Sequence, residues 1–170
     1  ETTIGSGDST FDIGGSNWDN SYNVYKVEFH NVKLTSTSDS ARINVRILKS
    51  DNSADTTSNY DYAFLGFRSS TSFDNLPDTN QTRWQNFNYL FRGGTGFNSN
   101  GALYLFNFNH ASGFNFLTVE MNSFGYDGDE LMGTAGGAVH TVNQLAKGLQ
   151  FSLTSSTYAG GKCVLYGLKK

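Results

Sequence analysis

Residues 22–34 read Tyr-Asn-Val-Tyr-Lys-Val-Glu-Phe-His-Asn-Val-Lys-Leu, and this stretch decides the fold. Bulky apolar side chains recur at every second position, at Tyr25, Val27 and Phe29, with polar side chains between them. Successive side chains of an extended chain point to opposite faces, so a repeat of two predicts a strand with one buried face. We therefore predict a half-buried β-strand here.

The same alternation recurs in the segment 41–48. There Ile43, Val45 and Ile47 are expected on the inner face, with polar residues between them. Polar runs rich in Ser, Asn, Asp and Gly separate the alternating segments and are typical of turns. Further strands are predicted at residues 60–68, 83–91, 102–109, 116–124, 131–142, 149–154 and 162–168.

Three local arrangements follow from these patterns. The segments 22–34 and 41–48 are expected to pair as a hairpin across a polar turn. Residues 69–79 contain the only proline, Pro77, and are expected to form a loop. Residues 10–13 are expected to pair close to the terminal strand, because first and last strands often share a sheet.

These features predict an all-β fold in a single domain that spans residues 1–170. Each alternating strand has one apolar face, and two facing sheets bury both sets of apolar side chains. We expect an antiparallel, jelly-roll-like β-sandwich of about nine or ten strands. With 14 Phe, 9 Tyr and only 16% charged residues, the composition excludes a disordered chain and disfavours a helical bundle.

The charge pattern excludes several classes of partner. The net charge is −3, and the basic residues form no cluster beyond Lys169 and Lys170, so binding to nucleic acid is not expected. No apolar run is long enough for a membrane helix, so membrane insertion is not expected either. The single Cys163 has no partner for an internal disulfide and is predicted to be a buried strand residue.

No catalytic residue, cofactor or metal site is predicted. The three histidines, at positions 30, 110 and 140, lack the spacing of a zinc site. The densest acidic stretch, residues 127–130, lacks the spacing of a calcium loop and is typical of a tight turn. Nucleophile motifs such as G-x-S-x-G are absent from the sequence.

Four aromatic residues beside Asn- and Ser-rich segments are the candidate ligand-binding residues: Trp18, Trp84, Tyr89 and Tyr126. Aromatic faces can stack on the C–H bonds of a sugar ring, and neighbouring amides can bind its hydroxyl groups. The alternative for each of these side chains is packing in the core or in an interface between subunits. Both alternatives stay open at the level of sequence.

Three groups of motifs occur in a fixed order along the chain. Phe11-Asp-Ile-Gly-Gly15 precedes the strand at 22–32. The sequence Ser36-Thr-Ser-Asp39 leads into the strand at 41–48 and then to Asn59-Tyr-Asp-Tyr-Ala63. The chain ends on Gly160-Gly-Lys-Cys-Val-Leu-Tyr-Gly-Leu168. Together these motifs resemble β-sandwich domains of tailed-phage virion proteins, found in tail fibres and related appendages, notably those of marine phages.

The resemblance implies a non-enzymatic structural protein of the virion, made in the host cytoplasm. It implies a homotrimer, with exposed loops that contact a glycan on the host surface or another capsid or tail protein of the virion. The matched positions are scaffold, so no catalytic residue is carried over. The chain is then either a tail-fibre domain, the distal part of a longer protein, or a small capsid decoration or head-appendage protein. A secreted carbohydrate-binding module or lectin is the alternative from another class.

Overall fold

The computed structural model describes residues 1–35, 43–70, 73–85, 87, 98–124 and 131–169. These residues form eleven strands and one short 3-10 helix, η1 (Gly15–Asn17). The strands are β1 (Thr2–Ile4), β2 (Thr10–Gly14), β3 (Val24–Leu34), β4 (Ile43–Ile47), β5 (Tyr60–Arg68), β6 (Phe73–Gln81), β7 (Ser99–Phe106), β8 (Asn115–Phe124), β9 (Leu131–His140), β10 (Gly148–Leu153) and β11 (Tyr158–Leu168).

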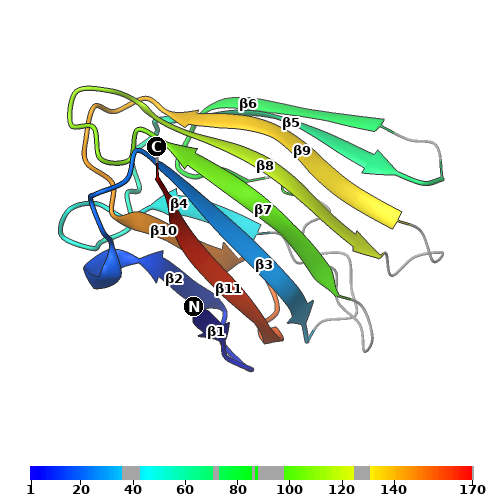
Figure 1. Ribbon diagram of the computed structural model, residues 1–170. Helices are drawn as coiled ribbons and strands as arrows, with labels where there is room; N and C mark the ends of the chain where they lie inside the picture. Colours follow the sequence, from blue (N-terminus) through cyan, green and yellow to red (C-terminus); the bar gives the residue numbers. More distant parts are fainter. Residues whose placement is uncertain (36–42, 71–72, 86, 88–97, 125–130, 170) are drawn as a thin grey trace.

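The strands form two antiparallel sheets of unequal size. Eight strands form the large sheet in the order β1-β11-β3-β7-β8-β9-β5-β6, and three form the small sheet in the order β2-β10-β4. Figure 1 shows the small sheet crossing behind β11 and β3, so that the two sheets lie face to face. The predicted all-β sandwich is confirmed, with eleven strands among the described residues.

The core lies between the inner faces of the two sheets. Every second residue of a strand points into it. In β8, Leu117, Val119 and Met121 are buried, whereas the residues between them are exposed. Tyr25, Val27 and Phe29 of β3 are buried in the same way, as the sequence predicts. Because the small sheet is narrow, large side chains fill much of the remaining space.

Aromatic side chains join the two sheets. Phe29 of the large sheet packs edge-on against Phe151 of β10, with ring centroids 5.2 Å apart. Tyr60 of β5 is fully buried; its hydroxyl group accepts a hydrogen bond from the Ile47 N–H of β4 (3.1 Å) and donates one to the Asp55 carbonyl (2.9 Å). This hydroxyl group therefore connects the backbone of the small sheet to a side chain of the large sheet.

Three local predictions are wrong. β3 and β4 do not form a hairpin, because β4 pairs with β10 in the small sheet while β3 pairs with β7 and β11. Part of the expected loop at 69–79 is strand β6, where Pro77 is tolerated because β6 is an edge strand. Residues 10–13 belong to β2, which pairs with β10; β1 is the strand that pairs with the terminal β11.

The bond between the sheets can be tested with Tyr60→Phe, which keeps the ring and removes the hydroxyl group. The buried Ile47 N–H then has no acceptor, so we expect the free energy of unfolding to fall by about 1–3 kcal/mol. Chemical denaturation followed by fluorescence measures this change. Tyr62→Phe is the matched control, because the Tyr62 hydroxyl group bonds Asp78 within the large sheet (3.2 Å) and its loss should cost less. Equal losses in the two variants would contradict a special role for Tyr60.

Candidate functional site

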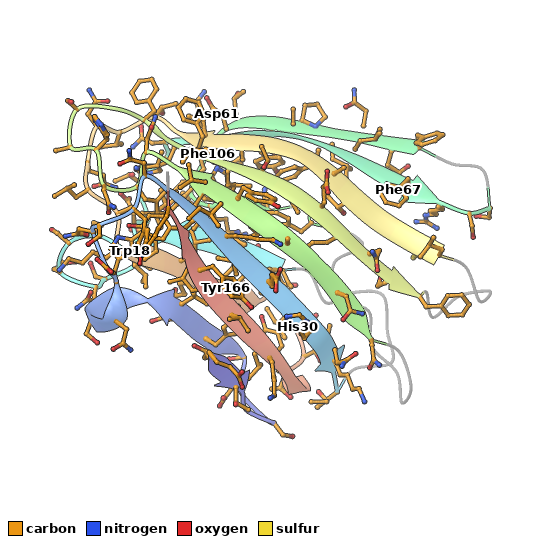
Figure 2. The ribbon with its side chains drawn as sticks, viewed as in Figure 1. Trp18, His30, Asp61, Phe67, Phe106 and Tyr166 are labelled. Carbon is orange, nitrogen blue, oxygen red and sulfur yellow. The ribbon has the colours of Figure 1, made fainter. Side chains whose placement is uncertain are left out.

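The outer face of the large sheet carries the candidate site. Directly paired residues of antiparallel strands point to the same face, so the strand register arranges side chains in rows across the sheet. One row crosses seven strands from β11 to β6 and contains Tyr166, Lys26, Tyr104, Thr118, Gly137, Ala63 and Pro77. We call it the central row. Figure 2 labels Tyr166 at one end and, beside the other end, Asp61 of the neighbouring row.

A polar hollow of about 360 Å³ lies on one side of Tyr104. Its floor is Ala102, which is paired with Glu28 of β3 on one side and with Glu120 of β8 on the other. The other polar side chains that line it come from Lys26, His30 and Asn100. The hollow therefore combines an aromatic ring with carboxylates, an amine, an imidazole and an amide.

Hydrogen bonds hold Glu28 in place within this hollow. Its two carboxylate oxygens lie 2.6 Å from the Lys26 amine and 3.3 Å from the His30 imidazole. The hydrogen bond from Lys26, with smaller contributions from Tyr166 and His30, lowers the pKa of Glu28 and outweighs the opposing effect of desolvation. Glu28 is thus ionised at neutral pH, which suits it to accept hydrogen bonds rather than to donate a proton.

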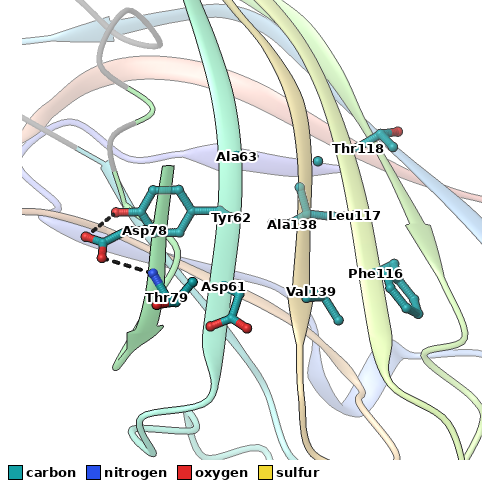
Figure 3. A pocket seen from close by; sticks show the side chains of 11 residues that line it. Asp61, Tyr62, Ala63, Asp78, Thr79, Phe116, Leu117, Thr118, Ala138 and Val139 are labelled. Atoms are coloured by element: carbon teal, nitrogen blue, oxygen red, sulfur yellow. Dashed lines mark hydrogen bonds between the residues drawn. The ribbon is translucent and has the colours of Figure 1, made fainter. Parts of the chain in front are cut away.

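An apolar groove of about 470 Å³ lies further along the same row, over β8, β9 and β5. Figure 3 shows its side chains, with Phe116 on one wall and Ala63 on the floor. Asp61 and Thr118 contribute polar atoms at the rim. One Asp61 oxygen accepts a hydrogen bond from the Asn80 N–H (2.7 Å).

A separate apolar cluster, which we call the corner patch, lies on the same face at the other end of β5. It consists of Leu65, Phe67, Phe73 and Leu131. Phe73 is 73% exposed and is paired with Phe67, which is labelled in Figure 2. The outer face therefore presents a polar hollow, an apolar groove and an apolar corner.

Trp18 and Trp84 support the structure instead of offering open binding surfaces. Trp84 is fully buried, packs edge-on against Tyr60 (5.2 Å between ring centroids) and donates its indole N–H to the Val139 carbonyl (3.1 Å). Of the two alternatives for Trp84, the structure therefore shows packing in the core and not an open surface for a glycan. Trp18 is half-buried; its ring lies 3.9 Å from that of Tyr25, and its N–H donates to Asn109 (2.8 Å).

Tyr89, Tyr126 and the acidic stretch 127–130 lie outside the described residues. Sequence reasoning missed the central row because its members come from strands far apart in the chain. The sequence does indicate which residues point to the outer face, because polar or small residues such as Lys26 and Thr118 alternate with apolar ones. Which of these positions become neighbours depends on strand order, which the alternation does not specify.

Cys163 is buried, as the sequence predicts, and burial raises the pKa of its thiol far above the usual range. A thiol held in its neutral form is a poor nucleophile. Among the described residues, no three His, Cys, Asp or Glu side chains gather as metal ligands. Within the same ranges, no helix has the length and apolar character needed to cross a membrane.

A buried pair, His140 and Asp55, lies at the end of β9 away from the outer face. Their side chains are 0% and 4% exposed, and His140 Nε2 lies 3.4 Å from Asp55 Oδ2. Burial lowers the pKa of His140 despite the opposing charge of Asp55. Burial alone would raise the pKa of Asp55, but hydrogen bonds from Thr57 and Gln144 outweigh it and lower that pKa. The pair is therefore a neutral imidazole beside a carboxylate at neutral pH.

No family model matches this sequence, and comparisons with curated proteins and with solved structures found no match.

The buried histidine makes stability depend on pH. In the unfolded chain His140 binds a proton near pH 6.5, but in the folded chain it does so only at lower pH. As the pH falls from 7 towards 5, the unfolded state gains more protons and the free energy of unfolding decreases, by at most about 1.4 kcal/mol per pH unit. Denaturation at a series of pH values should show a shallower slope for His140→Phe. His110→Phe, at an exposed position away from the pair, is the matched control for the loss of a histidine. A slope in His140→Phe that equals the wild-type slope would refute this account.

Proposed function

We propose that this chain is a non-enzymatic structural domain of a tailed-phage virion appendage, which assembles as a homotrimer and contacts glycans on the host surface. The β-sandwich is compatible with this function, as is the order of motifs along the chain. The observation that carries the proposal is the corner patch. An apolar cluster on a face otherwise rich in polar side chains is typical of a surface that contacts another protein.

Copies of the same chain are the proposed partner of the corner patch. Leu65 and Leu131 are 43% and 48% exposed, and Phe73 extends beyond them from the edge strand β6. Aromatic and large aliphatic side chains are favoured in the cores of subunit interfaces, where charged residues are depleted. A cyclic arrangement of three copies would cover the patch on each of them.

Two other assignments remain as alternatives. A capsid decoration or head-appendage protein would use the same interface between copies and differ only in its place on the virion. A secreted carbohydrate-binding module would be a monomer, and the polar hollow around Tyr104 favours this possibility. The mass in solution separates the monomeric assignment from the two oligomeric ones.

The proposal predicts a particle of three chains, each of 18.6 kDa, in size-exclusion chromatography with light scattering. Phe73→Asp places a charge in the corner patch, which should shift the particle to monomers because a buried, unpaired charge is costly. The side chain is largely exposed within one chain, so the fold and the melting temperature of the monomer should be little changed.

Phe114→Asp is the matched control. Phe114 is 42% exposed and immediately precedes β8 at the end opposite to the corner patch, so this variant should keep the mass of the wild type. A wild-type chain that remains monomeric at high protein concentration would refute the assembly. Dissociation caused equally by both variants would refute the assignment of the corner patch.

A further inference from the structure

We propose that the central row is a binding track for a neutral oligosaccharide, which lies across the strands from the polar hollow to the apolar groove. This inference rests on the glycan contact in the proposed function and moves that contact from the loops to the sheet. Its residues lie on the outer face, where the rigid strand register fixes their spacing. A pre-formed site of this kind binds without the cost of ordering a loop.

The polar hollow fits the hydroxyl groups of a sugar. Glu28 is held by Lys26 and His30, so its carboxylate is already fixed before a ligand arrives. Glu120 stands on the far side of Ala102 and provides a second acceptor, and Asn100 provides an amide. Hydrogen bonds from hydroxyl groups to an ionised carboxylate are stronger than those between neutral groups.

An aromatic surface borders the hollow. The ring of Tyr104 lies 5.7 Å from the Lys26 amine, which positions the ring and the cation together. A sugar ring has a face of C–H bonds that can pack on an aromatic ring while its hydroxyl groups reach the polar side chains. The hollow therefore offers both kinds of contact that a saccharide needs.

The charges around the track favour a neutral ligand. Lys26 provides one positive charge, whereas four carboxylates line the two hollows: Glu28, Glu120, Asp61 and Asp78. The positive charge of Lys26 is already paired with Glu28 at 2.6 Å. An acidic sugar would meet the remaining carboxylates and be repelled, so uronic and sialic acids should bind poorly.

Gly137 is the observation that argues most directly for an occupant of the groove. Among the described residues, a Cβ at this position would meet only the Leu117 carbonyl oxygen, at 3.6 Å, and the backbone there does not have a positive φ. By contrast, a Cβ at Gly133 would come within 2.1 Å of the Phe67 ring, so packing requires that glycine. Glycine weakens a strand, and at Gly137 the fold alone does not demand it.

Glycine at position 137 keeps the groove open, because it has no side chain to fill the floor. Gly137 is paired with Thr118 on one side and with Ala63 on the other, so the floor is low across three strands. Phe116 then stands as a wall on which a sugar face can pack, and Asp61 and Thr118 lie within reach of its hydroxyl groups. The groove is thus apolar with a few polar atoms at its rim, as in many small-ligand sites.

The two hollows are neighbours along the central row, because Tyr104 lines the polar hollow and Thr118 lines the apolar groove. Tyr104 is directly paired with Thr118, and Thr118 is directly paired with Gly137. Neighbouring strands lie about 5 Å apart, so Tyr104 and Gly137 are separated by roughly 10 Å across the sheet. An extended oligosaccharide can span this distance, whereas a monosaccharide can occupy only one of the two hollows. Affinity should therefore rise with chain length.

The test is binding of immobilised oligosaccharides of two to six units, in linear gluco-, manno-, galacto- and N-acetylglucosamine series, with oligogalacturonides as the acidic counterpart. We expect at least one neutral series to bind, with affinity increasing with length, and the acidic series to bind less. Tyr104→Ala removes the ring beside the polar hollow, and Gly137→Val fills the apolar groove. Each variant should weaken binding of the longest oligosaccharide by about tenfold or more, a loss of about 1.4 kcal/mol in binding free energy.

Ala159→Val adds a similar volume at an exposed position of β11 outside the track and should leave binding unchanged. Gly137→Val should remain folded, because nothing clashes with its Cβ, and its melting temperature shows this.

A trimer that binds no neutral series would overturn the track and leave the assembly intact. A monomer that binds one would retain the track and overturn the assembly. Loss of the trimer in Gly137→Val would also overturn the track, because that face would then be a subunit contact.

Discussion

The large sheet of eight strands must bury one face, and within the described part of the chain the three strands of the small sheet lie opposite it. This mismatch determines how the core is built. Three short strands cannot cover eight, so large side chains supply the missing contacts. Phe29 packs edge-on against Phe151 of the small sheet, Trp84 packs against Tyr60, and Phe87 packs against Phe64. The Tyr60 hydroxyl group adds a hydrogen bond between the layers. Burial of apolar surface provides most of the stability, and the aromatic shapes determine where the small sheet can sit.

Among the residues that the structure describes, no second sheet lies over the outer face of the large sheet. We propose that side chains of this face serve recognition. The strand register divides them by chemistry: polar and aromatic groups at Tyr104 and Glu28, an open floor at Gly137, and an apolar corner at Phe73. We propose that the corner patch contacts other copies of the chain and that the central row contacts a saccharide.

Much of the fold could be predicted from the sequence because alternation is a local property. The buried sets of β3 and β8 follow directly from Val27 and Val119 and their neighbours two residues away. Strand partners are not local, so the predicted pairing of β3 with β4 was wrong. Pro77 was misread because the sequence does not reveal that β6 is an edge strand, where a missing N–H costs little.

The candidate site was less predictable than the fold. Trp84 is next to polar residues in the chain yet lies in the core, because one side chain can point inward while its polar neighbours point outward. The central row could not be assembled from the sequence, since Lys26, Tyr104 and Gly137 become neighbours only through the order of the strands. Glycine at position 137 became informative only when its surroundings showed space for a side chain.

Hydroxyl-radical footprinting of the assembled protein, with and without a bound neutral oligosaccharide, tests most directly whether the outer face is divided in this way. The account predicts that Phe73 and Leu131 are protected by assembly alone, and that Tyr104 and Phe116 become protected only when the saccharide is added. Protection of Tyr104 and Phe116 in the assembly without saccharide, or of none of these residues under either condition, would contradict it.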